Sequence, residues 1–273
     1  MKRFFDRESS KVEGRIPRPS VLPYKPDLNV SALYRGSRIG GDFFDFLVLS
    51  DTRLLFLLSD IAGKREEALS IAASVQEMLW EQGPRLLSAE DANVSDAVTE
   101  LALELNRTIL HAAGGVHPAP TFLGCLDEQF GMLHYVSAGH TPAFVKGVGE
   151  IVELDPTGLP LGLFSHATHD AQVSVVPSGA SVVLVSKGLV EIVAADRQEF
   201  GIDRVKKLLQ EGTYPSAQEL CQEVLGQAVR FSEQPSAFGP RFSIPGFRES
   251  TDANDLTVVC IMRTVQAAVA VSA

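Results

Sequence analysis

The order of its apolar segments places the strongest limit on how this chain folds. Two central stretches, residues 66–82 and 95–111, repeat apolar residues every three or four positions and predict amphipathic helices, with Ser95 as the N-cap of the second. Short apolar runs bounded by turn residues lie on both sides and predict strands, several of them joined as hairpins. This pattern favours an α+β sandwich over a doubly wound parallel sheet.

The strand-like runs place most of the chain in one sheet-forming domain. Residues 256–262 are apolar almost throughout and predict a central strand that is covered on both faces. Residues 232–253 contain three prolines and no clear period, which predicts a long loop that is either functional or disordered. The predicted strands are residues 29–34, 43–49, 53–59, 121–126, 132–137, 143–146, 151–154, 172–176, 181–186 and 256–262, and one more helix is expected at 217–231.

The ends of the chain differ from its middle in composition. Residues 1–27 are rich in proline and charge and predict an arm that lies on the domain or stays mobile. We expect one domain over residues 28–264 and a tail over 265–273. The N-terminal residues lack the apolar core of a signal peptide, and no run of 18 apolar residues occurs, so we expect a cytoplasmic protein without a membrane partner.

Charge, cysteine and histidine content exclude further kinds of site. The formal net charge of −10 argues against binding to nucleic acid or to an anionic membrane surface, because both need a basic face. Cys125, Cys221 and Cys260 are far apart and are expected to be buried thiols in a reducing compartment. The histidines show no spacing typical of a zinc site, and His140 is expected to hold its turn by hydrogen bonds.

Three short acidic segments stand at the ends of predicted strands. Asp42 and Asp45 follow paired glycines, which allow close backbone approach, and alone they predict solvated turn carboxylates. Asp60 stands at the tip of a buried strand before a glycine turn, where it is suited to hold a cation or to cap a helix. Asp255 precedes the last strand, where a turn or capping role is the ordinary expectation. Each segment alone is ambiguous.

Taken in order, these segments and three others form a series of motifs. The series is GGDFFDF at 40–46, DIAGK at 60–64, SAGHTP at 137–142, GLPLGL at 158–163, SKGLVE at 186–191 and NDLT at 254–257. It resembles the SpoIIE-type branch of the PPM (protein phosphatase 2C-like) family over about residues 20–263. The resemblance implies an α+β fold, a four-layer α-β-β-α sandwich of two antiparallel sheets flanked by helices.

The resemblance also implies an activity and a site. Members of the family are metal-dependent protein serine/threonine phosphatases, in which two Mn²⁺ or Mg²⁺ ions activate a water that attacks phosphorus. By match to the motifs, Asp42 and Asp60 are the catalytic, metal-binding acids, and the Ile61 carbonyl is a backbone ligand. Asn254 and Asp255 fill the last metal-binding motif. The implied partner is a phosphoprotein of a signalling system, such as an anti-sigma-factor antagonist.

Three positions depart from the family pattern. Lys187 stands where the family has the aspartate of TDG, Asn254 where it has the first aspartate of DDxT, and Arg65 where it has a glycine. The first two changes alter the local charge by three units. Two unit charges about 4 Å apart interact by roughly 4 kcal/mol at an effective dielectric constant near 20, which is about a thousandfold in affinity. The sequence therefore predicts a damaged two-ion centre, and Glu191 is expected to be a helix or turn partner.

Several arrangements would leave the site usable. A nearby aspartate, Asp252 or Asp255, would take over the lost ligand position, and Lys187 would point to solvent. If the Lys187 ammonium instead pairs with Asp60, it takes the place of one ion and the two-ion centre is lost. A single ion held by Asp42 and Asp60 is a further arrangement. Two functions therefore stay open. One is an active phosphatase, and the other is a catalytically weakened or inactive pseudophosphatase that acts as a phosphoprotein-binding regulator.

Overall fold

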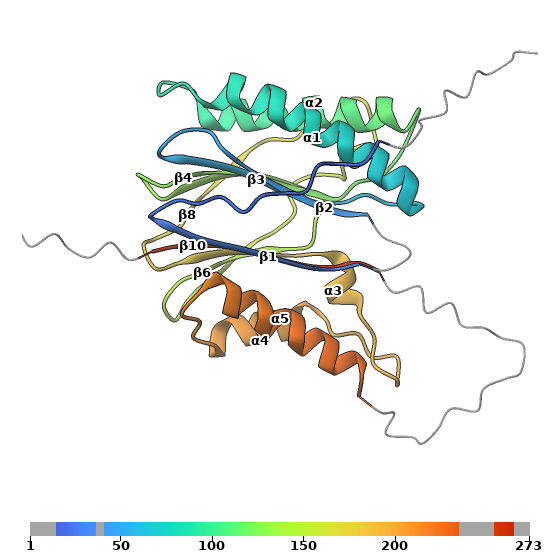
Figure 1. Cartoon of the computed structure of the whole chain (residues 1–273), viewed down its shortest axis with the longest axis vertical. Helices are drawn as coiled ribbons and strands as arrows, with labels where there is room; N and C mark the ends of the chain where they lie inside the picture. Colours follow the sequence, from blue (N-terminus) through green and yellow to red (C-terminus); the bar gives the residue numbers. More distant parts are fainter. Residues whose placement is uncertain (1–14, 37–40, 235–253, 265–273) are drawn as a thin grey trace, which may run out of the picture.

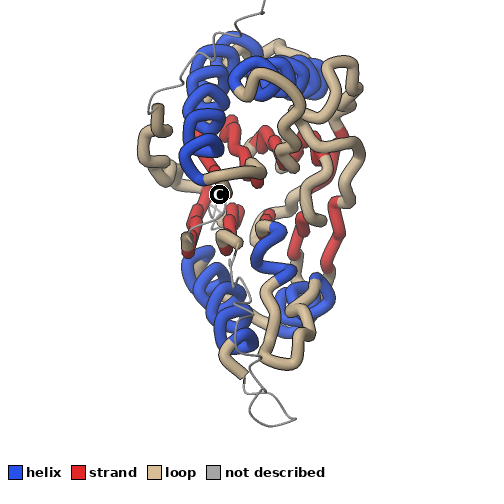
Figure 2. The backbone as a smooth tube through the Cα atoms, turned by 90° about the vertical axis from the view of Figure 1, so that its right-hand side faces the viewer, coloured by secondary structure: helices blue, strands red, loops and turns tan. Residues whose placement is uncertain are grey.

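The protein is a layered sandwich of helices and sheets. The computed structural model describes residues 15–36, 41–234 and 254–264. Two five-stranded antiparallel sheets face each other, and helices cover their outer faces (Figure 1). Turned by 90°, the helical layers lie at the two ends of the molecule with the strands between them (Figure 2). This confirms the predicted α-β-β-α arrangement.

The two sheets are built from strands that are far apart in the sequence. One sheet has the order β2 (Asp42–Val48), β3 (Arg53–Asp60), β4 (Thr121–Asp127), β5 (Met132–Ala138) and β8 (Gln172–Val175). The other has the order β1 (Leu28–Arg35), β10 (Leu256–Arg263), β9 (Ser181–Val185), β6 (Ala143–Lys146) and β7 (Ile151–Leu154). Helices α1 (Arg65–Leu87) and α2 (Val94–Ala112) cover the first sheet, and α3 (Lys187–Glu191), α4 (Ile202–Glu211) and α5 (Ala217–Ser232) lie on the side of the second.

Strands buried on both faces hold the layers together. Leu55 and Leu57 of β3 pack with α1 and α2, whereas Leu54, Phe56 and Leu58 pack between the sheets. Successive side chains of a strand point to opposite faces, so a strand that is covered on both faces is apolar throughout. Strand β10 has the same pattern and lies between β1 and β9, which confirms the predicted central strand.

The helices differ from the sequence prediction in their starts and number. Helix α2 has Asn93 as its N-cap, and the Asn93 side chain accepts a hydrogen bond from the Asp96 amide. The prediction of Ser95 as N-cap was wrong, because Ser95 lies in the first turn with its hydroxyl 2.8 Å from Nδ1 of His134. Helices α3 and α4 were not predicted. Helix α3 has only five residues, whereas α4 has Ile202, Val205, Leu208 and Leu209 at helical spacing, a period that the sequence analysis missed.

Part of the N-terminal arm lies on the domain. The Arg18 backbone exchanges two hydrogen bonds with the Gln76 side chain of α1, at 2.7 and 3.0 Å. Lys25 is buried, forms an ion pair with Glu128 and donates to two carbonyls of the β2–β3 turn. Residues 1–14, 265–273 and most of the predicted loop 232–253 lie outside the described residues. Among the helices that the structure describes, none has the length and apolar character of a membrane span.

Candidate functional site

Asp42 and Asp60 face each other at one end of the first sheet. They are directly paired across β2 and β3, at the first residue of one strand and the last of the other. Beyond them the Ile61 amide donates to the Gly41 carbonyl at 3.1 Å. A Cβ atom on Gly41 would lie 2.1 Å from the Ile61 carbonyl oxygen, so only glycine fits there. The Ile61 carbonyl therefore lies against Gly41, the residue before Asp42.

The Asp42 carboxyl group is held by a residue from the other sheet. The Thr257 hydroxyl of β10 donates to Oδ2 of Asp42 at 2.6 Å. Burial raises the pKa of Asp42 to about 8, and the charges of Asp60 and Asp255 add to this rise, whereas hydrogen bonds from Thr257 and Ser186 oppose it. A carboxyl group with this pKa is largely protonated at neutral pH unless a cation lies nearby.

Asp60 lies in the field of several other charges. Burial raises the pKa of Asp60, the Lys187 ammonium lowers it, and the carboxylates of Asp255 and Glu191 raise it further. The residues that sequence matching selects from three distant segments therefore meet at one end of the sandwich.

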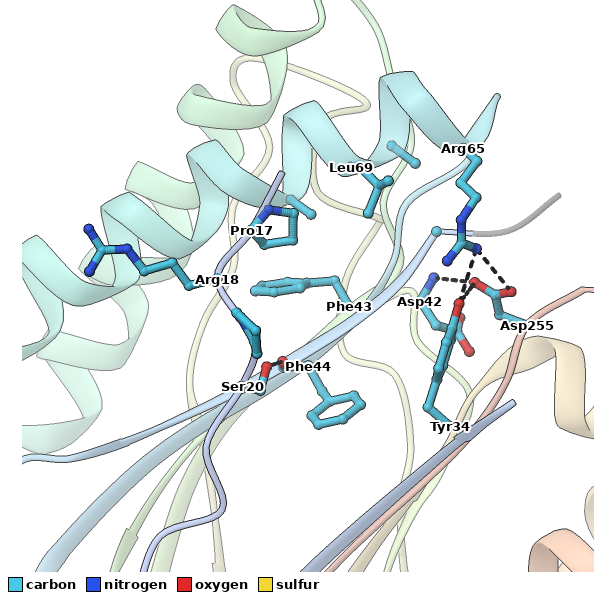
Figure 3. Close-up of a pocket in the computed structure, with 14 residues that line it drawn as sticks. Pro17, Arg18, Ser20, Tyr34, Asp42, Phe43, Phe44, Arg65, Leu69 and Asp255 are labelled. Carbon is cyan, nitrogen blue, oxygen red and sulfur yellow. Dashed lines mark hydrogen bonds and ion pairs between the residues drawn. The ribbon is translucent and has the colours of Figure 1, made fainter. Parts of the chain in front are cut away.

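Asp255 is buried and already engaged by protein groups (Figure 3). The Tyr34 hydroxyl donates to its Oδ2 at 3.0 Å, and the Asp42 amide approaches the same oxygen at 3.4 Å. Nη1 of Arg65 lies 3.8 Å from its Oδ1 and donates to the Tyr34 hydroxyl at 3.1 Å. Sequence reasoning noted Arg65 only as a lost glycine and did not select Tyr34. The available signal was an arginine at a motif position where the family has a glycine.

Asn254 and Lys187 lie at the junction of β10 and α3. Asn254 is exposed. A Cβ on Gly188 would lie 2.2 Å from the Asp255 carbonyl oxygen, so the start of α3 packs directly on that strand. Nζ of Lys187 lies 3.4 Å from Oε1 of Glu191, so the ion-pair partner of Lys187 is Glu191, and its effect on Asp60 acts over a longer distance. Asp252 lies outside the described residues.

Two neighbouring motif residues have structural contacts. Asp45 is buried and accepts hydrogen bonds from Nε2 of Gln76 at 2.9 Å and Nε1 of Trp80 at 2.8 Å. The prediction of a solvated carboxylate was wrong for Asp45, because α1 covers that edge of β2. Nδ1 of His140 donates to the Thr141 carbonyl at 2.8 Å, and burial lowers the pKa of His140 to about 4, so a neutral imidazole sits in the turn.

The formal charges of this site leave an excess of two negative charges. Arg65 and Lys187 carry two positive charges, and each lies near one or more of the acids. The four carboxylates that share the site are Asp42, Asp60, Asp255 and Glu191. The resulting excess of two negative charges is the amount that one divalent cation would balance.

The two-sheet sandwich and the acids at its end define a domain of the PP2C-type phosphatase class. The family model described as "Stage II sporulation protein E (SpoIIE)" matches residues 50–237. The chain therefore belongs to the SpoIIE family. Protein IcfG of Synechocystis sp. (strain ATCC 27184 / PCC 6803 / Kazusa) is 24% identical over 221 residues, which cover 72% of this chain and 35% of IcfG. The chain thus spans about a third of that relative.

Solved structures show the same fold at low sequence identity. The RsbU and RsbW domains of Rv1364c from Mycobacterium tuberculosis match with a TM-score of 0.67 and 20% identity, over 89% of this chain and 61% of that one. The PP2C phosphatase domain of SpoIIE from Bacillus subtilis, with a fragment of its regulatory domain, matches with a TM-score of 0.66 and 15% identity, over 87% and 64%. RsbX, solved in complex with magnesium, matches with a TM-score of 0.58 and 13% identity, over 89% and 98%.

Phosphatases of this family generally depend on Mn²⁺ or Mg²⁺. The oxygen donors that this chain places at the site decide how many such ions it would hold. Within the described ranges, no three His, Cys, Asp or Glu side chains are arranged to hold a metal ion together. Asp255 is engaged by Tyr34 and Arg65, so the residues present do not fit two ions. Asp42, Asp60 and the Ile61 carbonyl offer adjacent oxygen donors of the kind that Mn²⁺ and Mg²⁺ prefer. These three donors are the residues that would hold a single ion.

Proposed function

We propose that this chain is a metal-dependent protein serine/threonine phosphatase that uses a single divalent ion held by Asp42 and Asp60. The pairing of these two acids across β2 and β3 carries the proposal. Two carboxylates this close are not both ionised without a positive charge between them, and the raised pKa values of Asp42 and Asp60 agree with that. The chemistry that Mn²⁺ or Mg²⁺ supplies in such a site is activation of a water molecule and neutralisation of phosphoryl oxygens.

The surrounding residues position the two acids. The Thr257 hydroxyl holds one oxygen of Asp42 and fixes the orientation of the carboxyl group. The Ser186 hydroxyl accepts from the Thr257 amide at 3.0 Å and donates to the Asp255 carbonyl at 3.2 Å, so it ties the end of β9 to the start of β10. These bonds fix the second sheet against the two acids of the first, and precise placement of charged groups is what phosphoryl transfer requires.

The substrate class follows from the family. We propose that the chain hydrolyses phosphoserine or phosphothreonine in a signalling protein, of the kind represented by anti-sigma-factor antagonists. Similar structures include the RsbU and RsbW domains of Rv1364c and a component of the bacterial stressosome. These likenesses support a regulatory phosphoprotein as partner.

Hydrolysis of p-nitrophenyl phosphate with Mn²⁺ tests the proposal. We expect measurable activity in the wild type, loss of that activity in Asp60→Asn, and unchanged activity in Asp91→Asn, which alters an exposed aspartate. A reaction that is unaffected by chelation, or by Asp60→Asn, would contradict the proposed roles of the ion and of Asp60.

A second function is favoured by one observation. Because Asp255 is engaged by Arg65 and Tyr34, and Lys187 and Asn254 replace two acids of the family motifs, few acids are available to hold metal. A pseudophosphatase that binds a phosphoprotein and regulates it by occupancy would need no hydrolysis. Absence of hydrolysis, absence of Mn²⁺ binding by calorimetry and retained binding of a phosphoprotein would together select this second function.

A further inference from the structure

Two basic side chains form ion pairs with acids of the site. Arg65 opens α1 and reaches Asp255 and the Tyr34 hydroxyl through the same nitrogen, at 3.8 and 3.1 Å. Lys187 opens α3 and pairs with Glu191 at 3.4 Å. Figure 3 shows the Arg65 guanidinium directed at Asp255 and Tyr34 from the helix side.

We infer that Arg65 and Lys187 are built-in replacements for the second divalent ion, and that they supply its two positive charges from the protein itself. The inference rests on the proposed function, in which one exchangeable ion is held by Asp42 and Asp60. In this arrangement Arg65 neutralises Asp255, and Lys187 neutralises Glu191. One divalent ion then balances the remaining two negative charges.

The surrounding contacts fix these two cations unequally. The Asp255 side chain is almost completely buried, and its contacts with Tyr34 and the Asp42 amide hold the acceptor for Arg65 in place. The Lys187 side chain is 54% exposed, but its backbone is fixed because Gly188 packs on the Asp255 carbonyl. Arg65 is therefore the more rigid substitute, and Lys187 is the one with freedom to approach a phosphoryl group.

A protein cation differs from a metal ion in one testable way. A bound metal is removed by a chelator, whereas an arginine or lysine stays. Removing these two cations should therefore create a demand for one more divalent ion. The number of ions bound per chain reports this directly and does not depend on turnover.

The experiment counts Mn²⁺ ions per chain by calorimetry and by electron paramagnetic resonance. The test variant is Arg65→Ala with Lys187→Ala, which removes both cations without adding a carboxylate. Its matched control is Arg85→Ala with Lys207→Ala, which changes an arginine of the same helix and a lysine with the same i, i+4 glutamate spacing, both in exposed ion pairs. If the test variant does not fold by circular dichroism, Lys187→Ala alone and Arg65→Gln replace it.

We expect the test variant to bind one more Mn²⁺ ion than the wild type, and the control to bind the same number as the wild type. An unchanged number in a folded test variant overturns the inference. The wild-type count judges the proposed function separately. If the wild type binds no ion, the one-ion phosphatase is wrong, whereas the gain of one ion in the test variant still decides whether Arg65 and Lys187 replace an ion.

Discussion

Replacing Asp255 with asparagine tests whether this residue is a structural anchor or a metal ligand without its ion. The two roles predict changes of opposite sign in the free energy of unfolding. As an anchor, Asp255 holds Tyr34, Arg65 and the Asp42 amide, so Asp255→Asn should lower the free energy of unfolding. As a metal ligand without its ion, Asp255 would be repelled by Asp42 and Asp60, so Asp255→Asn would raise the free energy of unfolding.

The size of the effect follows from two contacts. An ion pair at 3.8 Å is worth about 4 kcal/mol at an effective dielectric constant near 20, but the Arg65 side chain is 41% exposed, which reduces the pair to about 1 kcal/mol. In Asp255→Asn the Tyr34 hydroxyl still has an oxygen acceptor, but that oxygen no longer carries a charge, which costs about 1 kcal/mol more. We therefore expect a loss of about 2 kcal/mol.

Urea unfolding in the presence of a chelator measures this difference. Asp91→Asn, at an exposed position, serves as the control and should change the free energy of unfolding by less than about 0.5 kcal/mol. An Asp255→Asn variant that is more stable than the wild type would refute the anchoring role and, with it, the reason for excluding a second ion.

Three further predictions follow from the site and from the arm. Burial raises the pKa of Asp42 to about 8, above its value in the unfolded chain, so the stability that depends on this group is greatest below about pH 4 and is lost as pH rises through about 8. The loss in the free energy of unfolding amounts to about 1.4 kcal/mol per unit of pKa difference. In unfolding measured in the presence of a chelator, Asp42→Asn should remove much of this loss. Lys25→Met leaves Glu128 buried without its ion-pair partner and should lower the free energy of unfolding in urea by about 3–5 kcal/mol. The double variant Lys25→Met with Glu128→Gln should recover most of that loss. Equal stability of the single and double variants would mean that the unpaired Glu128 charge costs little. Lys187→Asp with Asn254→Asp restores the acids of the family motifs and should tighten Mn²⁺ binding by up to about a thousandfold in calorimetry, unless Arg65 alone keeps the second position closed.

The fold was predictable from the sequence because its strands are local patterns. The continuous apolar runs of β3 and β10 each identify a strand without knowledge of its neighbours. Helix starts were less predictable, since Asn93 and Ser95 are both suitable caps and only the bond to the Asp96 amide decides between them. The same limit applies to Asp45, whose burial depends on Gln76 and Trp80 of a later helix.

The candidate site was predictable in its acids and not in its cations. Motif order alone brought together Asp42 and Asp60, which the structure pairs directly. The contact between Tyr34 and Asp255 joins residues that are 221 positions apart, and no local pattern in the sequence reports such a contact. Arg65 has a plain interpretation as a helix-start residue, so its reach to Asp255 became visible only in three dimensions.

The number of Mn²⁺ ions bound to the wild-type chain at saturation tests the one-ion site most directly. Titration followed by electron paramagnetic resonance should give one ion per chain, and Asp60→Asn should abolish its binding. Two ions per wild-type chain would show that Arg65 and Lys187 leave room for the full family centre, and none would show that Asp42 and Asp60 do not form a metal site.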